Sequence, residues 1–217
     1  MNASVRQARS EDLESIVNVH MRAFRGFFLT MLGHRFLFEL YRGFLCIRDG
    51  RLLVAEIDGV IAGFVAGTFD PKSFFRTLLV TRWFIFGWAA FGAALSRPKT
   101  VFPRLLGALW YRGEQPARDL VGALISAIAV DPRLGAAGIG TTLIRAFCDE
   151  AMRHGLDYVY LTTDRDGNES TNAFYRRNGF EIESQLQRAN GRIMARYIRR
   201  LRFHTDECSE SRTRLSE

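Results

Sequence analysis

The stretch Val130-Asp131-Pro132-Arg133-Leu134-Gly135-Ala136-Ala137-Gly138-Ile139-Gly140-Thr141-Thr142-Leu143 decides how this sequence folds. An apolar run precedes it and apolar residues at helical spacing follow it, so it predicts a strand, a small-residue loop and the start of a helix. Backbone N–H groups at the start of a helix lack partners within the helix, and the helix dipole adds partial positive charge there. The three glycines let an anion approach the backbone closely. The stretch therefore predicts a phosphate or pyrophosphate site.

The segments on either side predict a sheet flanked by helices. Ser10 is the expected N-cap of the first helix, because acidic residues follow it in the first turn. Asp58-Gly59 separates two apolar runs and predicts a tight hairpin. The nearly continuous apolar run 120–130 predicts a long buried strand. The expected strands are 5–8, 52–57, 60–68, 120–130, 157–163, 180–187 and 192–199.

A second motif follows the glycine loop by about 35 residues. It consists of Asn168 and then Ala173-Phe174-Tyr175-Arg176-Arg177-Asn178-Gly179-Phe180. The pattern predicts a short helix over about 169–177 that ends at Asn178-Gly179. Either motif alone has a purely structural interpretation, as a flexible turn or as a helix end that packs on a strand.

In this order the two motifs resemble the GNAT superfamily, the acyl-CoA-dependent N-acyltransferases. The resemblance implies an α/β (α+β) fold with a mixed, mostly antiparallel sheet that splays beside the glycine loop. It also implies acetyl-CoA as acyl donor, no metal, and direct transfer of the acetyl group to an amine in a ternary complex. Residues 71–118, which are apolar and basic, fall outside the usual core of the family and predict a helical insertion with helices over about 74–95 and 101–111.

The same resemblance places the coenzyme on particular residues. The pyrophosphate is expected on the loop 135–141, and the pantetheine arm beside the strand that precedes it and beside the short helix. The expected coenzyme-binding residues are Ile128, Ala129, Val130, Gly135, Ala136, Ala137, Gly138, Ile139, Gly140, Thr141, Asn168 and Phe174. One departure is that Gly135 stands where the family has Gln or Arg, whereas Arg133 comes two residues early. Backbone N–H groups still remain for the anion.

Tyr175 matches the family tyrosine that serves as general acid toward the departing thiolate. A thiol has a pKa near 8.5 and a phenol near 10, so the phenol is protonated at neutral pH and can supply the proton. The general base is left open among Glu56, Asp70, Asp119 and Asp164, each of which is also explained by surface solvation. His20 and His34 are interpreted as packing residues.

The acceptor amine is expected near the aromatic segment 24–29 and the 71–118 insertion. An amino sugar or a sugar nucleotide fits, because Arg22, Arg25 or Arg35 would meet its phosphates. The alternatives are a peptide or protein N-acetyltransferase, a non-catalytic acyl-CoA-binding module and a membrane-surface interaction module.

Composition sets the remaining expectations. The 217 residues predict one domain over 1–204 and a polar tail over 205–217. Three cysteines without CxxC spacing predict neither a disulfide scaffold nor a zinc site, and fit a reducing, cytoplasmic compartment. The net charge of +7 is spread along the chain, so no nucleic acid is expected. The longest uncharged run, 83–96, is too short to cross a bilayer, while membrane-surface contact and a homodimer are left open.

Overall fold

Seven strands form one mixed sheet in the computed structural model, which describes residues 3–82, 122–134, 138–187 and 191–201. The strand order is β1-β2-β3-β4-β5-β7-β6. Every neighbouring pair is antiparallel except β4 and β5, which are parallel. The strands are β1 (Ser4–Gln7), β2 (Gly50–Ile57), β3 (Val60–Thr68), β4 (Gly122–Val130), β5 (Tyr158–Asp164), β6 (Glu181–Gln187) and β7 (Ile193–Arg200). The mixed, mostly antiparallel fold predicted from the sequence is confirmed.

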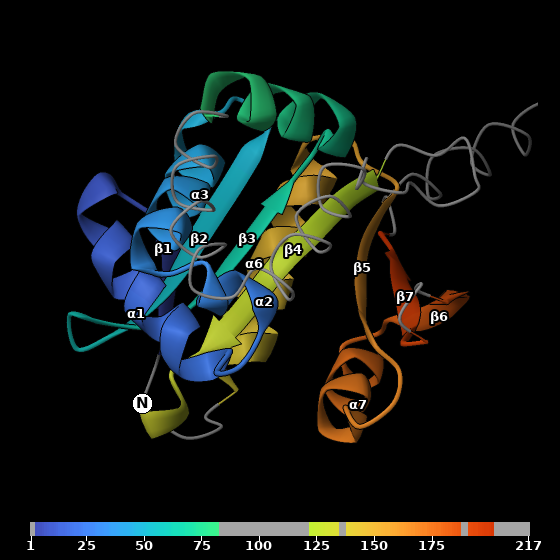
Figure 1. Cartoon of the computed structure of the whole chain (residues 1–217). Helices are drawn as coiled ribbons and strands as arrows, with labels where there is room; N and C mark the ends of the chain where they lie inside the picture. The colour runs from blue at the N-terminus through green and yellow to red at the C-terminus, as the bar shows by residue number, and fades with distance from the viewer. Residues whose placement is uncertain (1–2, 83–121, 135–137, 188–190, 202–217) are drawn as a thin grey trace, which may run out of the picture.

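Helices cover both faces of the sheet (Figure 1). Helices α1 (Leu13–Ala23) and α3 (His34–Cys46) share one apolar cluster with one face of the sheet, and the short α2 (Phe28–Met31) lies between them in the chain. Helix α6 (Ile139–Arg153) packs on the opposite face through a second cluster. Helix α7 (Glu169–Arg177) follows β5 and contributes Tyr175 to the second cluster. Helix α7 has the predicted bounds of about 169–177, and α6 follows the glycine loop as the sequence predicts.

The predicted hairpin is confirmed, and the first helix expected within 71–118 begins three residues before the predicted start at 74. Asp58 and Gly59 join β2 to β3 with φ angles of 49° and 78°, as a tight turn at Asp-Gly requires. A helix begins at Pro71 and is described to residue 82. Its Leu78 side chain lies against Gly43 and fills the space that a Cβ there would need. Gly43 is therefore a close contact between two helices. The helix expected over 101–111 and the tail lie outside the described residues.

Two local expectations are corrected. Ser10 does not cap α1 but opens a 3-10 turn (Ser10–Asp12). The buried Asp12 accepts a hydrogen bond from the Arg9 N–H at 2.7 Å and forms an ion pair with Arg6 at 2.7 Å. The strand predicted over 120–130 is buried without interruption only at 122–125. Beyond that, Ser126 is exposed, Ala127, Ile128 and Val130 are half-buried, and Ala129 alone is buried.

Candidate active site

The second half of β4 has a strand neighbour on one side only. Among the described residues, β4 and β5 pair at Gly122–Leu124 with Tyr158–Tyr160 and not beyond. The register with β3 shifts between Ala66 and Gly67, which leaves Ser126 as an extra residue in β4. A bulge bends a strand and increases its twist, so β4 turns away from β5 at this point. Figure 1 shows the two strands diverging toward α7.

The free edge of β4 presents backbone groups of two predicted residues. Asp131 donates its N–H to the Ala62 carbonyl at 2.8 Å, so Asp131 faces β3. Backbone groups alternate sides along an antiparallel strand, so those of Val130 and Ile128 face away from β3, toward the β5 side. Ala129, the residue between them, is buried and faces β3.

The start of α6 supplies the next part of the site. Gly138 is the N-cap and has a φ of 75°, a left-handed conformation that glycine adopts without strain. A Cβ on Gly140 would lie 3.0 Å from Cζ of Phe174, so the first turn of α6 lies against the ring of an α7 residue. Ile139 is buried in the core and Thr141 is half-buried. Gly135, Ala136 and Ala137 lie outside the described residues.

Amide side chains hold α7 in place. Asn168 is the N-cap residue, and its Nδ2 donates to Thr163 Oγ1 at 2.9 Å and to the Asp164 carbonyl at 3.3 Å. The buried Asn172 donates to the Arg165 carbonyl at 2.8 Å and accepts from the Tyr197 hydroxyl at 3.2 Å. The donors of Asn168 are thus already used to anchor α7. Asn172, which is buried, joins α7 to both Arg165 and Tyr197.

Tyr175 lies inside this anchored helix. Its ring packs near those of Phe174, Phe180 and Tyr197, at centroid distances of 5.3, 5.9 and 5.7 Å. The side chain is 7% exposed, and burial raises the pKa of its phenol well above 10. The phenol therefore remains protonated at any pH at which the protein would be assayed.

The carboxylates considered as general bases have other contacts where they are described. Glu56 pairs with Arg6 at 2.8 Å, and Asp164 pairs with Arg192. Asp70 accepts the Ser73 N–H at 3.0 Å and so caps the helix that begins at Pro71. Asp119 lies outside the described residues.

The two histidines lie in packing environments. His20 Nδ1 lies 2.6 Å from the Tyr41 hydroxyl in the core, and burial lowers the pKa of His20 to about 4. His34 lies 2.9 Å from Glu14 at the surface.

Asp131 is a buried acid that the sequence interpretation missed. It is 1% exposed at the end of β4, and its Oδ2 lies 2.9 Å from Arg22 Nη2 and 2.8 Å from Arg133 Nη2. Hydrogen bonds from Arg133 are the main cause that lowers the pKa of Asp131 to about 2. An acidic residue between the strand and the proline was the available signal.

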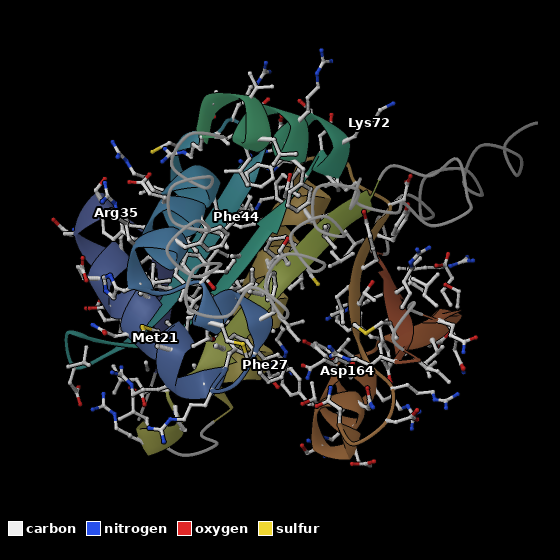
Figure 2. The ribbon with its side chains drawn as sticks, in the orientation of Figure 1. Met21, Phe27, Arg35, Phe44, Lys72 and Asp164 are labelled. Atoms are coloured by element: carbon white, nitrogen blue, oxygen red, sulfur yellow. The ribbon has the colours of Figure 1, made fainter. Side chains whose placement is uncertain are left out.

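The segment 24–29 forms a compact turn with an apolar exterior. The Phe24 carbonyl accepts the Phe27 N–H at 3.2 Å and the Thr30 hydroxyl at 2.7 Å. Phe27 is 53% exposed. In Figure 2 Phe27 and Asp164 are labelled near the centre of the view, on either side of the region where β4 and β5 diverge, whereas Arg35 lies at the outer side of the helix layer.

Within the residues that the structure describes, no group of three or more His, Cys, Asp or Glu residues is arranged to hold a metal ion. No helix in the described part of the chain is long and apolar enough to cross a membrane.

Comparison with known proteins agrees with this geometry. Residues 103–180 match the model of the acetyltransferase (GNAT) family. Ard1 from Thermoplasma volcanium superposes with a TM-score of 0.59 at 16% identity, over 94% of this chain and 100% of that one. The ribosomal-protein-S18-alanine N-acetyltransferase from Escherichia coli superposes with a TM-score of 0.59 at 12% identity, over 95% of this chain and 98% of that one. PaiA N-acetyltransferase from Thermoplasma acidophilum, solved in complex with coenzyme A, superposes with a TM-score of 0.55 at 15% identity, over 93% of this chain and 100% of that one. No curated protein sequence matches the chain.

The splayed sheet and the family match define an N-acetyltransferase that uses acetyl-CoA as its donor. Over residues 103–180 the chain is similar to the GNAT acetyltransferase family, and its fold is that of the solved N-acetyltransferases named above.

Proposed function

We propose that this enzyme transfers an acetyl group from acetyl-CoA to a primary amine on a small molecule, by direct attack within a ternary complex. The observation that carries the proposal is the convergence of three elements. The free edge of β4, the glycine-rich start of α6 and the Tyr175-bearing α7 meet where β4 and β5 diverge, with Gly140 against Phe174 as their point of contact.

The residues present fit the coenzyme. In the proposal, backbone groups of Ile128 and Val130 bind the pantetheine arm as an added strand would, with Ala129 holding their register. The N–H groups of Gly138, Ile139, Gly140 and Thr141, together with Gly135, Ala136 and Ala137, hold the pyrophosphate. Phe174 lines the arm, and Asn168 fixes the start of α7. Gly140 supports the fit, because any side chain there would displace Phe174.

Tyr175 is the proposed general acid. Acetyl-CoA supplies the thioester carbonyl carbon and the thiolate leaving group. The neutral amine nitrogen attacks that carbon, the C–S bond breaks, and the sulfur takes the phenol proton. The nitrogen then releases its extra proton and the phenolate regains one, both by exchange with solvent. The products are the N-acetyl amine and the free thiol.

The surface favours an amino sugar, free or as its nucleotide, as the acceptor. An exposed aromatic side chain such as Phe27 offers a flat apolar surface for a sugar ring. Of the three arginines considered for its phosphates, Arg22 is paired with Asp131 and Arg35 lies away from Phe27, so Arg25 is the one that fits.

The test combines Tyr175→Phe with an acceptor screen. We expect the variant to lose turnover by about 100-fold or more, as removal of a general acid does, while its affinity for coenzyme A by calorimetry is unchanged. Tyr41→Phe is the control, because it removes another buried phenol, in the apolar cluster on the other face of the sheet from Tyr175, and should retain turnover.

The screen follows acetyl-CoA consumption with amino sugars, their nucleotides, polyamines, amino acids and peptides. Turnover confined to peptides would make the enzyme a peptide or protein N-acetyltransferase. A wild-type protein that binds acetyl-CoA without turnover on any amine would instead be a sensor, and one that does not bind it would refute the proposal.

A further inference from the structure

We propose that Arg133 supplies the cationic side chain that binds the phosphates of the coenzyme, and that Asp131 is a positioning residue that holds Arg133 in place and ties the loop to α1 through Arg22. This inference rests on the proposed function, because it assigns residues to the same coenzyme site. It adds a side-chain contact that the resemblance does not supply, since Gly135 has none.

Arg133 is fixed and exposed at the same time. Its Nη2 and Nε lie 2.8 and 3.1 Å from the Asp131 carboxylate, and its backbone N–H donates to Oδ1 at 3.1 Å. Its side chain is nevertheless 66% exposed. A guanidinium anchored by a buried acid loses little rotational freedom on binding a phosphate, and the exposed nitrogens are free to face solvent.

The location suits an anion. Arg133 lies in the 3-10 turn Pro132–Leu134, directly after the free edge of β4 and before the N-cap of α6. This turn is tied to the strand, since the Leu134 N–H donates to the Asp131 carbonyl at 3.0 Å. Arg133 therefore lies in the chain between the free edge of β4 and the first turn of α6, whose first N–H groups lack partners within the helix.

The charge balance also favours anion binding. One carboxylate, Asp131, neutralises only one of the two guanidiniums it contacts, Arg22 and Arg133. The cluster keeps a net charge of +1 at neutral pH. Since Arg22 is 28% exposed and Arg133 is 66% exposed, the surplus positive charge lies toward solvent at Arg133.

Arg22 extends the cluster to the acceptor side. It lies in the last turn of α1, two residues before Phe24 opens the segment proposed for the acceptor. The Arg22–Asp131 pair at 2.9 Å therefore links the coenzyme loop to the start of that segment. Loss of this ion pair should weaken binding of the acceptor amine more than binding of the coenzyme.

Calorimetric titration with coenzyme A and with dephospho-coenzyme A tests the assignment at low and high salt. We expect Arg133→Ala to weaken coenzyme A binding about 5- to 10-fold at low salt, and by less at high salt, because an exposed charge contact is screened. Arg133→Lys should recover part of the loss, and Asp131→Asn should weaken binding with a smaller effect. Arg9→Ala is the matched control, since Arg9 is also paired with a carboxylate and 68% exposed but lies beside β1 at the edge of the sheet.

The two ligands separate the phosphates. If the loss caused by Arg133→Ala disappears with dephospho-coenzyme A, Arg133 binds the 3′-phosphate; if it persists, Arg133 binds the diphosphate. Equal affinity of Arg133→Ala and wild type for both ligands would overturn the inference and leave the proposed function standing. Failure of the wild type to bind either ligand would refute the proposed function itself.

Arg22→Ala gives an independent measurement. We expect its affinity for coenzyme A to stay within about 2-fold of wild type while the KM for the amine rises several-fold. A variant with unchanged KM for the amine would overturn the link to the acceptor segment.

Discussion

Helices α6 and α7 flank the same splayed edge but are held by different forces. Helix α6 buries six side chains, all of them apolar or thiol: Ile139, Leu143, Ile144, Phe147, Cys148 and Ala151. Helix α7 buries only Asn172 and Tyr175, and amide hydrogen bonds attach it to β5 and β7. Apolar burial is non-directional, whereas hydrogen bonds fix distances and angles.

The difference assigns distinct tasks to the two helices. Helix α6 is firmly packed on the sheet, so its first turn can present N–H groups to an anion without moving. Helix α7 is smaller and less apolar, yet in the proposed function it presents the Tyr175 phenol at a defined point. Directional anchors are suited to that task, and their loss should cost more activity than stability.

The largest predicted effect is on the free energy of unfolding, through the apolar packing of α6. Phe147→Ala removes a fully buried ring from α6, and we expect it to lower the free energy of unfolding by about 3–5 kcal/mol. Urea denaturation followed by circular dichroism measures this. Arg145→Ala, exposed on the same helix, should change it by less than about 0.5 kcal/mol. A loss below about 1 kcal/mol for Phe147→Ala would contradict the role given to apolar burial.

The next effect tests the anchors of α7. Asn172→Ala removes the donor to the Arg165 carbonyl and the acceptor of the Tyr197 hydroxyl. We therefore expect the free energy of unfolding to fall by about 1–3 kcal/mol. Turnover at 25 °C should fall about 10-fold in protein that is still folded, because Tyr175 is no longer held in place. Ser170→Ala, exposed on the same helix, is the control for both measurements. Full turnover in folded Asn172→Ala would show that the amide anchors stabilise α7 without positioning Tyr175.

The same contrast explains what the sequence could predict. The boundaries of α6 and α7 follow from local signals: glycines, apolar spacing and Asn178-Gly179. The free edge of β4 does not follow from such local signals, because a strand with one neighbouring strand and a strand with two can have the same apolar sequence. Ser126 at the bulge is the one polar residue in that run, and it marks the place where continuous burial of the strand ends.

The side-chain anchors were harder to predict, because each joins residues distant in sequence. Asn172 contacts Tyr197 across 25 residues, and Arg22 contacts Asp131 across more than 100. One sequence gives no signal for such pairs. The hydrogen bonds from Asn168 to Thr163 and Asp164 were also not predicted, whereas the contact of Asn168 with the coenzyme stays a prediction.

A smaller effect is expected where the two helices touch. Gly140→Ala adds a methyl group 3.0 Å from Phe174 Cζ, so the ring must move by a few tenths of an ångström. Alanine also favours the helix by about 1 kcal/mol, so stability should change little. We expect the KM for acetyl-CoA to rise about 3- to 10-fold, measured by steady-state kinetics. Thr142→Ala, exposed one residue beyond Thr141, should keep the wild-type KM, and a wild-type KM in Gly140→Ala would mean that Phe174 does not line the coenzyme path.

The smallest effect concerns reactivity rather than activity. Burial raises the pKa of the Cys148 thiol to about 11, so at pH 8 about 0.1% of it is thiolate, compared with about a quarter of an ordinary thiol of pKa near 8.5. Alkylation of the native protein by iodoacetamide, quantified for each cysteine by mass spectrometry, should therefore be more than about 10-fold slower at Cys148 than at the exposed Cys46. The Cys148 rate should rise with pH up to about 11, since only the thiolate reacts. Equal rates at the two cysteines would mean that α6 opens as readily as the surface does, and α6 could then not be the firmly packed helix from which α7 differs.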